Sequence, residues 1–528
     1  MIFLSLFVCA MCGLTAALPF RYMESSLPVW FALAPVFWLV THAKNKKLAA
    51  LHGFVFALFW AARSFTFMWA CAFEGSIPLS LYTACVYTLA LLCVRRLGRV
   101  GGGAAVFGVG AVWALTEIFR SVVPLIYFPW LLLGHTLLNN VPLRQEADLF
   151  GVYGLSFVIA SFNGLLAFAL PSVLPAHFRA GRDAGIKSAW KCASFLFAIV
   201  AGLYSYGYER SARLAPHLQS GPTIALIQGD IKTKLGRTDA MLDAQFTQHL
   251  GLHRKAIADV SAKVGKPPVL VCWAETMVPG EFNVSDMGRT MKSEVRKMGI
   301  PALFGSNFLE ADDPNLPVDE LTRIHNSAFL LDKNGDEILR YFKRRLVVFG
   351  EYIPGARDYP FLRVLRSVTR DHYVPGTEPS PIIVVGGYRI ALNLCVEDIH
   401  PVIAREAAFG GADTLINLTN DGWFYGTHGP RAHAMAAMWR AIETRHPLLR
   451  VTHTGHTIAV NPLGEITMAL PPETEAVGGV ALQRIDGDGS KIITPYMRLG
   501  EFWTAVFFGL VLVVTLLRPP ESTSTPGA

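Results

Sequence analysis

Residues Ala391–His400, with the sequence ALNLCVEDIH, contain the strongest candidate nucleophile of this chain. An apolar, strand-like run ends at Cys395, and two carboxylates, Glu397 and Asp398, follow it at the second and third positions. A thiol with bases and hydrogen-bond acceptors close by has what nucleophilic catalysis requires. The same ten residues also fit a small core cysteine beside a helix with an acidic first turn.

Two other predicted strands end in polar side chains that a core would not contain. Val269–Trp273 runs into Glu275, and YFKRRLVVFGEYIP places Lys343 after a hairpin strand and Glu351 eight residues later. If one sheet holds these ends side by side, a carboxylate, an ammonium group and the thiol converge. Glu275 can then act as general base, Lys343 can favour the thiolate and an oxyanion, and Cys395 can attack an acyl carbonyl. Taken singly, Glu275 and Lys343 are more typical of surface charges.

The elements that must position these residues indicate a soluble α/β domain from about Pro222 to Pro495. Amphipathic patterns predict helices over Ala240–Val264 and Ser285–Met298, and Asn334-Gly335 predicts a hairpin turn. A domain of this size buries an ample core without disulfides. The predicted strands are Thr223–Gln228, Val269–Trp273, Ala302–Ser306, Ser327–Leu331, Ile382–Val385, Ile390–Leu394, Thr414–Leu418 and Thr457–Val460.

The rest of the chain has the composition of a membrane protein. Of its 528 residues, 52% are hydrophobic and only 16% are charged. The net charge of +7 comes from short groups of Lys and Arg between apolar runs, which argues against a nucleic-acid partner. Eight apolar runs have lengths near that needed to cross a bilayer. These predicted spans are Met1–Phe20, Leu27–Ala43, Leu48–Ala70, Ile77–Val94, Ala104–Phe119, Val152–Leu174, Ser188–Tyr208 and Phe502–Leu517.

The positive charges predict the orientation of these spans. Lys44–Lys47, Arg95–Arg99 and Arg179–Lys187 lie in alternate loops, whereas the other loops carry little positive charge. By the positive-inside rule both termini are cytoplasmic and the region after Tyr208 lies outside. We therefore predict a transmembrane domain of seven helices at residues 1–215, a catalytic domain at 216–498, and a last transmembrane helix with a short, disordered tail at 499–528.

Several segments of this chain form a recognisable set of motifs. They are CWAETMVPG, YFKRRLVVFGEYIP, LNLCVED, NLTNDGWFYGTHGP and RAIETRHPLLRVTHTGHT, with FPW at Phe128–Trp130 and GVYGLS at Gly151–Ser156 in the membrane part. These segments resemble apolipoprotein N-acyltransferases, membrane enzymes with a nitrilase-like (carbon-nitrogen hydrolase) domain. The ordered Glu, Lys and Cys blocks are typical of the nitrilase superfamily, and eight spans around them narrow the resemblance to the acyltransferases. The resemblance covers nearly the whole chain.

The resemblance implies a Glu275–Lys343–Cys395 triad in an αββα sandwich, with Glu351 as a second essential carboxylate and Glu397 after the nucleophile. It implies transfer of a fatty acyl chain from a phospholipid, through a cysteine thioester, to the α-amine of the diacylglyceryl-cysteine of an apolipoprotein. The expected partners are thus the phospholipid donor, the diacylated apolipoprotein and the bilayer, without a cofactor. The expected location is the inner membrane of a diderm bacterium, with the catalytic domain in the periplasm.

The chain departs from the family pattern outside the triad. Val396 stands where Tyr is common, Arg237 where Trp is usual, and Ala432 where Gln is common. His453 and His456 stand where Asn and an aliphatic residue are typical. These departures concern the binding of lipid or peptide, such as the preferred head group.

Three further residues are candidates for substrate binding. Trp423 in NDGWF resembles a family position near the active site, although a tryptophan at the edge of a core fits as well. Arg63, in the outer part of the third span, faces either a lipid phosphate or another helix. Phe361 belongs to the long loop Ala356–Tyr373, which alternates bulky apolar residues with arginines.

We predict that Tyr359, Phe361, Leu362 and Leu365 of this loop dip into the outer leaflet as a lipid gate, with Arg363 and Arg366 near phosphates. The alternative is a loop packed on the surface of its own domain.

No metal site is expected, because His428 and His433 lack a ligand set, and Cys272 is expected to be buried and inert. Two other classes of function stay open from the residues. A membrane-tethered amidase would use the same triad and let water attack the thioester. A transporter or a non-catalytic scaffold is the third class, but a transporter typically has broken, paired helices and midplane charges, and apart from Arg63 the spans are plain.

Overall fold

The computed structural model describes residues 2–517 apart from 23–24, 71–72, 101, 124–126, 169–185, 234–236, 311–322, 356–358, 360, 363–372 and 486–491. The chain forms two compact units. The first comprises Met1–Thr66, Ser76–Ala212 and Arg498–Ala528, and the second comprises Phe67–Gly75 and Arg213–Met497. The predicted tail Pro519–Ala528 lies outside the described residues.

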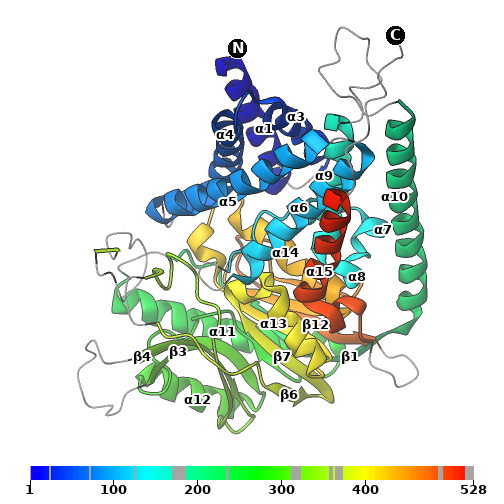
Figure 1. Ribbon diagram of the computed structural model, residues 1–528. Coiled ribbons are helices and arrows are strands. Elements are labelled where there is room, and N and C mark those ends of the chain that lie inside the picture. The colour runs from blue at the N-terminus through cyan, green and yellow to red at the C-terminus, as the bar shows by residue number, and fades with distance from the viewer. Residues whose placement is uncertain are drawn as a thin grey trace, which may run out of the picture. The chain divides into compact units, whose positions relative to one another are not determined.

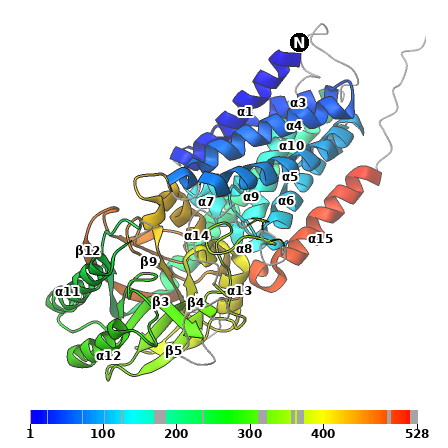
Figure 2. The same cartoon turned by 90° about the vertical axis from the view of Figure 1, so that its left-hand side faces the viewer.

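The first unit consists of helices, several of them long and apolar (Figure 2). Among the described residues five helices are long and apolar enough to cross a membrane, or six if Val141–Phe150 and Val152–Phe168, which meet at a bend of 115°, belong to one span. The other predicted spans are helical too, Leu27–Ala43 as the shorter α2 and α3 and Ser188–Tyr208 within α10. The helices are α1 (Ile2–Tyr22), α2 (Val29–Ala32), α3 (Ala34–His42), α4 (Lys46–Ser64), α5 (Phe73–Val100), α6 (Gly102–Val122), α7 (Val141–Arg144), α8 (Ala147–Phe150), α9 (Val152–Phe168), α10 (Ile186–Leu214) and α15 (Pro495–Leu517), with short 3₁₀ turns η1 (Phe65–Ala70) and η2 (Leu133–Leu137).

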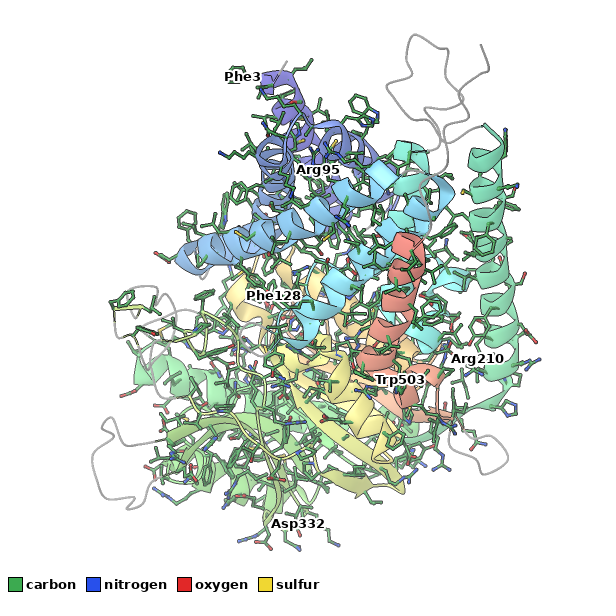
Figure 3. All side chains as sticks on the ribbon, in the orientation of Figure 1. Phe3, Arg95, Phe128, Arg210, Asp332 and Trp503 are labelled. Carbon is green, nitrogen blue, oxygen red and sulfur yellow. The ribbon has the colours of Figure 1, made fainter. Side chains whose placement is uncertain are left out.

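Buried polar side chains satisfy the backbone where these helices break. The side-chain oxygen of Asn163 in α9 accepts hydrogen bonds from the N–H groups of Leu33 and Ala34, at 3.0 and 2.9 Å, between α2 and α3. Arg95 of α5, labelled in Figure 3, donates to the carbonyl oxygen of Val40 near the end of α3 at 2.9 Å. An unpaired backbone group is costly in apolar surroundings, so these contacts stabilise the broken helix.

The second unit is a sandwich of two sheets, six-stranded in the described part of the chain, ordered β12-β1-β2-β3-β4-β5 and β11-β10-β9-β8-β7-β6. Apolar side chains of both sheets fill the space between them, α11 and α12 pack on the outer face of the first sheet, and α13 and α14 pack on the second (Figure 1). This is the αββα layer order that the resemblance implied. The strands are β1 (Leu218–Gln228), β2 (Val271–Cys272), β3 (Ala302–Glu310), β4 (Arg323–Leu331), β5 (Glu337–Phe342), β6 (Ile382–Val385), β7 (Tyr388–Leu394), β8 (Thr414–Thr419), β9 (Leu448–Thr452), β10 (Ile458–Val460), β11 (Ile466–Ala469) and β12 (Ala476–Ile485); the helices are α11 (Asp239–Val264), α12 (Asp286–Met298), α13 (Pro401–Phe409) and α14 (Gly429–Thr444), with 3₁₀ turns η5 (Ala215–His217), η7 (Cys395–Ile399) and η8 (Asp421–Phe424).

The predicted local elements of this unit are present. Each predicted strand overlaps an observed one, and both predicted helices match α11 and α12 within a residue or so. The hairpin between β4 and β5 turns at Gly335, whose φ of +78° only glycine adopts without strain. Asp332 marks this turn in Figure 3. The strands β9, β11 and β12 were not predicted.

A short stretch from between α4 and α5 belongs to the second unit. The ring of Phe67 meets the rings of Phe424 and His428, with centroids 5.1 and 5.4 Å apart. A Cβ added to Gly75 would lie only 2.8 Å from Cβ of Phe349, so the two backbones approach closely there. The sandwich is therefore completed by a piece of chain that lies far upstream of Arg213.

Candidate active site

The structure brings the three predicted catalytic residues together from the ends of three strands. Glu275 follows β2, Lys343 follows β5 directly, and Cys395 follows β7 directly. The ammonium nitrogen of Lys343 lies 3.0 Å from Oε1 of Glu275. The charges of Glu275 and Lys343 both act on the Cys395 thiol.

Lys343 is fully buried and bridges two carboxylates. Its Nζ donates to Oε1 of Glu275 at 3.0 Å and to Oε1 of Glu351 at 2.9 Å. Burial by itself lowers the pKa of Lys343, but Cys395 whenever it is ionised and the carboxylates of Glu275 and Glu351 outweigh it and hold the pKa well above its ordinary value. Lys343 is therefore a charged ammonium group throughout the physiological pH range.

Asn326, in the middle of β4, reinforces this bridge. Its side-chain nitrogen donates to the same two oxygens, Oε1 of Glu275 at 2.7 Å and Oε1 of Glu351 at 2.8 Å. The second oxygen of Glu351 accepts from the N–H of Val347 at 2.8 Å. Two donors thus hold the two carboxylates at a fixed separation.

The turn that carries Glu275 is fixed by close packing. The second carboxylate oxygen, Oε2, accepts the backbone N–H of Asn420 at 2.9 Å. A Cβ added to Gly305 in β3 would lie 2.5 Å from Cα of Glu275 and 2.6 Å from the nitrogen of Thr276. Only glycine at position 305 lets the Glu275 turn cross β3 this closely.

Cys395 has a strained backbone. Its φ is +48°, in the left-handed region that costs a non-glycine residue about 1–3 kcal/mol. Its carbonyl oxygen accepts from the side-chain nitrogen of Asn417 at 2.9 Å, which helps to hold this conformation. The residue as a whole is partly exposed, whereas its thiol group is removed from water.

The thiol of Cys395 is neutral in the resting site. Loss of hydration raises its pKa most, the charge of Glu275 raises it further, and Lys343 only partly offsets them. A base must therefore accept the thiol proton when the sulfur attacks, and the carboxylate of Glu275 is the nearby group able to do so.

Glu397 and Asp398, the carboxylates nearest to Cys395 in sequence, are engaged elsewhere. Glu397 is fully buried and accepts the N–H groups of Leu394 at 2.7 Å and Arg344 at 2.6 Å, and the hydroxyl of Tyr341 at 3.0 Å. Burial raises its pKa above the ordinary value, although these donors counteract it. Glu397 thus ties the turn of the nucleophile to the segment that follows Lys343. Asp398 faces His433 and Arg450.

The other predicted residues lie outside this constellation. Trp423 is partly exposed in η8, and Arg63 is partly exposed in the last turn of α4. Phe361 is 72% exposed, with its ring 6.2 Å from that of Tyr359. Of the predicted gate, Arg363, Leu365 and Arg366 lie outside the described residues. Cys272 is fully buried, as predicted.

Sequence reasoning missed the polar residues that orient the triad. Asn326, Asn417 and Tyr341 are positions within strands, and Asn420 follows β8 directly. An asparagine within a strand run, as in HNSAFLL and LINLTND, was the available signal. The part of the chain that the structure describes has no group of three or more His, Cys, Asp or Glu side chains placed to hold a metal ion.

Two family models match this chain. Residues 12–165 match the apolipoprotein N-acyltransferase N-terminal domain, and residues 223–488 match the carbon-nitrogen hydrolase family. A protein of Geobacter metallireducens named apolipoprotein N-acyltransferase is 31% identical, over 96% of this chain and 94% of its own. Proteins of the same name from Caulobacter vibrioides and Bdellovibrio bacteriovorus are 30% and 28% identical, over 91% and 86% of this chain and 85% and 80% of their own.

Proposed function

This chain belongs to the apolipoprotein N-acyltransferase family, and we propose that it moves a fatty acyl chain from a membrane phospholipid to the N-terminal amine of the diacylglyceryl-cysteine of an apolipoprotein. A thioester on Cys395 is the intermediate. The observation that carries this proposal is the contact of Lys343 Nζ with Glu275 Oε1, at 3.0 Å, beside the neutral thiol of Cys395, a residue that is partly exposed. It combines a base, a cation and a nucleophile in one site.

In the first half-reaction the acyl group moves to sulfur. Glu275 takes the Sγ proton of Cys395 as the sulfur attacks the ester carbonyl carbon. Among the described residues two carboxylates take two of the three N–H donors of Lys343, which leaves one for the oxyanion. When the carbon–oxygen bond breaks, Glu275 returns the proton to the departing oxygen, and lysophospholipid leaves.

In the second half-reaction the acyl group moves to nitrogen. The free amine of the apolipoprotein attacks the thioester carbon, and Glu275 takes the proton that the nitrogen loses. The carbon–sulfur bond breaks, the proton passes to Sγ of Cys395, and the amide product leaves. Because a thioester is more reactive toward an amine than an oxygen ester, the intermediate divides one difficult transfer into two easier steps.

We also propose the finer organisation of the chain: eight membrane crossings in a bacterial inner membrane, with a seven-helix domain at 1–215, a periplasmic catalytic domain at 216–498 and a last helix at 499–528. The asymmetry of Lys and Arg between alternate loops supports this orientation. Reporter fusions at Thr238 test it, because a cytoplasmic signal there would place the site on the wrong side for exported lipoproteins.

Three residues are proposed to contact the lipid substrates. Trp423 and Phe361 offer exposed aromatic surface to acyl chains, Phe361 as part of a gate in the loop that follows Glu351. Arg63 faces a lipid phosphate near the outer end of its helix.

The thioester can be detected by intact-protein mass spectrometry. Enzyme incubated with phospholipid and no acceptor should gain the mass of one acyl chain and release lysophospholipid. A diacylated lipopeptide with a free amine should discharge the adduct, whereas the N-acetylated peptide should not. Cys395→Ala should gain no adduct.

Two outcomes would count against the proposal. Equal uptake by Cys395→Ala would refute the nucleophile. Release of free fatty acid without an acylated amine would indicate the amidase instead, in which water discharges the thioester.

A further inference from the structure

Four charged side chains form a buried network beside the active site. Asp398, Asp421, His433 and Arg450 are each at most 1% exposed. His433 places Nε2 at 2.9 Å from Oδ1 of Asp398 and Nδ1 at 2.9 Å from Oδ1 of Asp421. Arg450 places Nε at 3.1 Å from Oδ2 of Asp398 and Nη1 at 2.8 Å from Oδ2 of Asp421. Two anions and two cations therefore balance in the interior of the second unit.

The surroundings of His433 favour its charged form. Each ring nitrogen lies 2.9 Å from a carboxylate oxygen, and a proton on both nitrogens avoids repulsion between a nitrogen lone pair and a carboxylate. The two carboxylates raise the pKa of His433 to about 9, although burial and Arg450 oppose them. The groups facing His433 are Asp398 from η7, Asp421 from η8 and Arg450 from β9, and the carbonyl oxygen of His456 accepts from Arg450 at 3.4 Å.

The network joins two turns. One begins at the proposed nucleophile Cys395, and the other follows Asn420, whose backbone N–H contacts the proposed base Glu275. Asp398 belongs to η7, which begins at Cys395. Asp421 directly follows Asn420, whose backbone N–H donates to Glu275 at 2.9 Å. A change in the spacing between Asp398 and Asp421 would thus change the spacing between thiol and base.

We propose that His433 is a positioning residue for acyl transfer: by bridging Asp398 and Asp421 it fixes the distance between the Cys395 thiol and the Glu275 carboxylate. This inference rests on the proposed thioester chemistry. A neutral imidazole has one N–H and can serve only one of the two carboxylates. Loss of its proton therefore loosens the site, and acylation slows above about pH 9.

The test is the rate at which Cys395 gains an acyl group from phosphatidylethanolamine vesicles, without acceptor, between pH 7 and pH 10. The rate for wild-type enzyme should fall as pH rises, along a limb centred near pH 9. Cys395 and Lys343 do not produce this limb, because the pKa values of both are raised well above their ordinary values. His433→Gln donates to one carboxylate only. It should be slower at pH 7 by about 10- to 100-fold, as expected for a misplaced base, and should lack the limb.

The double variant Asp398→Asn/His433→Gln tests whether the single variant is slow only because an unbalanced buried charge disturbs its fold. In the double variant the charges of Asp421 and Arg450 still balance each other. It should acylate faster at pH 7 than His433→Gln alone, and it too should lack the limb. His253→Gln is the matched control, since His253 is another fully buried histidine of this unit and accepts from the indole N–H of Trp273 at 3.0 Å. It should keep the limb near pH 9.

Two results separate the possible failures. If wild-type enzyme never gains an acyl group, the proposed function itself fails. If wild-type enzyme is acylated but lacks the limb, or either His433 variant keeps it, His433 does not position the site and only this inference is overturned.

Discussion

Gly305→Ala should damage catalysis through the backbone of the general base. The added Cβ would stand 2.5 Å from Cα of Glu275 and 2.6 Å from the nitrogen of Thr276, whereas ordinary contacts begin at 3.4 Å. Both neighbours are backbone atoms, so the Glu275 turn must move by about 1 Å. A misplacement of that size lowers rates by about 100-fold. The contacts of Glu275 with Lys343, at 3.0 Å, and with Asn420, at 2.9 Å, are those that lengthen.

The assay is the rate of acyl-adduct formation on Cys395, followed by intact mass, together with thermal unfolding in detergent. Overpacking of this kind costs about 1–3 kcal/mol, so Gly305→Ala should melt a few degrees lower but remain folded at the assay temperature. Gly251→Ala in α11 is the control, because its added Cβ meets nothing within 4 Å. Adduct formation at the wild-type rate in Gly305→Ala would refute the idea that the position of Glu275 limits the reaction.

Further predictions concern the neighbours of the triad. Asn326→Ala removes the side-chain nitrogen that donates to Glu275 at 2.7 Å and to Glu351 at 2.8 Å. Adduct formation should slow about 10-fold, since hydrogen bonds to charged groups contribute about 1.5–3 kcal/mol. An unchanged rate would show that Lys343 alone suffices to hold the two carboxylates. Glu275→Gln should speed alkylation of Cys395 by iodoacetamide at neutral pH while slowing acylation, because the Glu275 charge raises the thiol pKa; slower alkylation would contradict this. Phe361→Ser should impair the use of vesicle phospholipid more than that of a small soluble ester, and equal losses would argue against a gate. The pKa of His433 in the folded protein is raised to about 9 from an ordinary value near 6.5, so its charge stabilises the fold by about 3 kcal/mol below pH 6, and this stabilisation disappears as pH rises through 9. The melting temperature of the wild-type enzyme should fall over that range by more than that of His433→Gln.

The three candidate catalytic residues could be located because each follows a strand-like run that local sequence reveals. Glu275, Lys343 and Cys395 break an apolar pattern at the point where the pattern ends. Asn326 and Tyr341 could not be assigned this way, because a side chain within β4 or β5 reaches the site only in the register that pairs these strands.

The missed strands have a related cause. In β9, Arg450 interrupts an apolar run, and it is tolerated there because its carboxylate partners come from turns after β7 and β8. In β12, Gly478 and Gly479 weaken the strand pattern, and their pairing with Leu226 and Ala225 of β1 involves residues far apart in the chain. A local sequence pattern does not reveal pairing partners that lie this far apart in the chain.

The stretch Phe67–Gly75 constrains how the protein can be made. Phe424 and His428 of the sandwich contact Phe67, and Phe349 meets Gly75. A secreted fragment that begins at Arg213 would therefore expose this apolar contact surface to water. During biogenesis the α4–α5 connection leaves the ribosome first and must already be on the same side of the membrane when the later turns emerge. Insertion of the early helices thus precedes completion of the enzyme, and a mistranslocated hairpin would yield an incomplete fold.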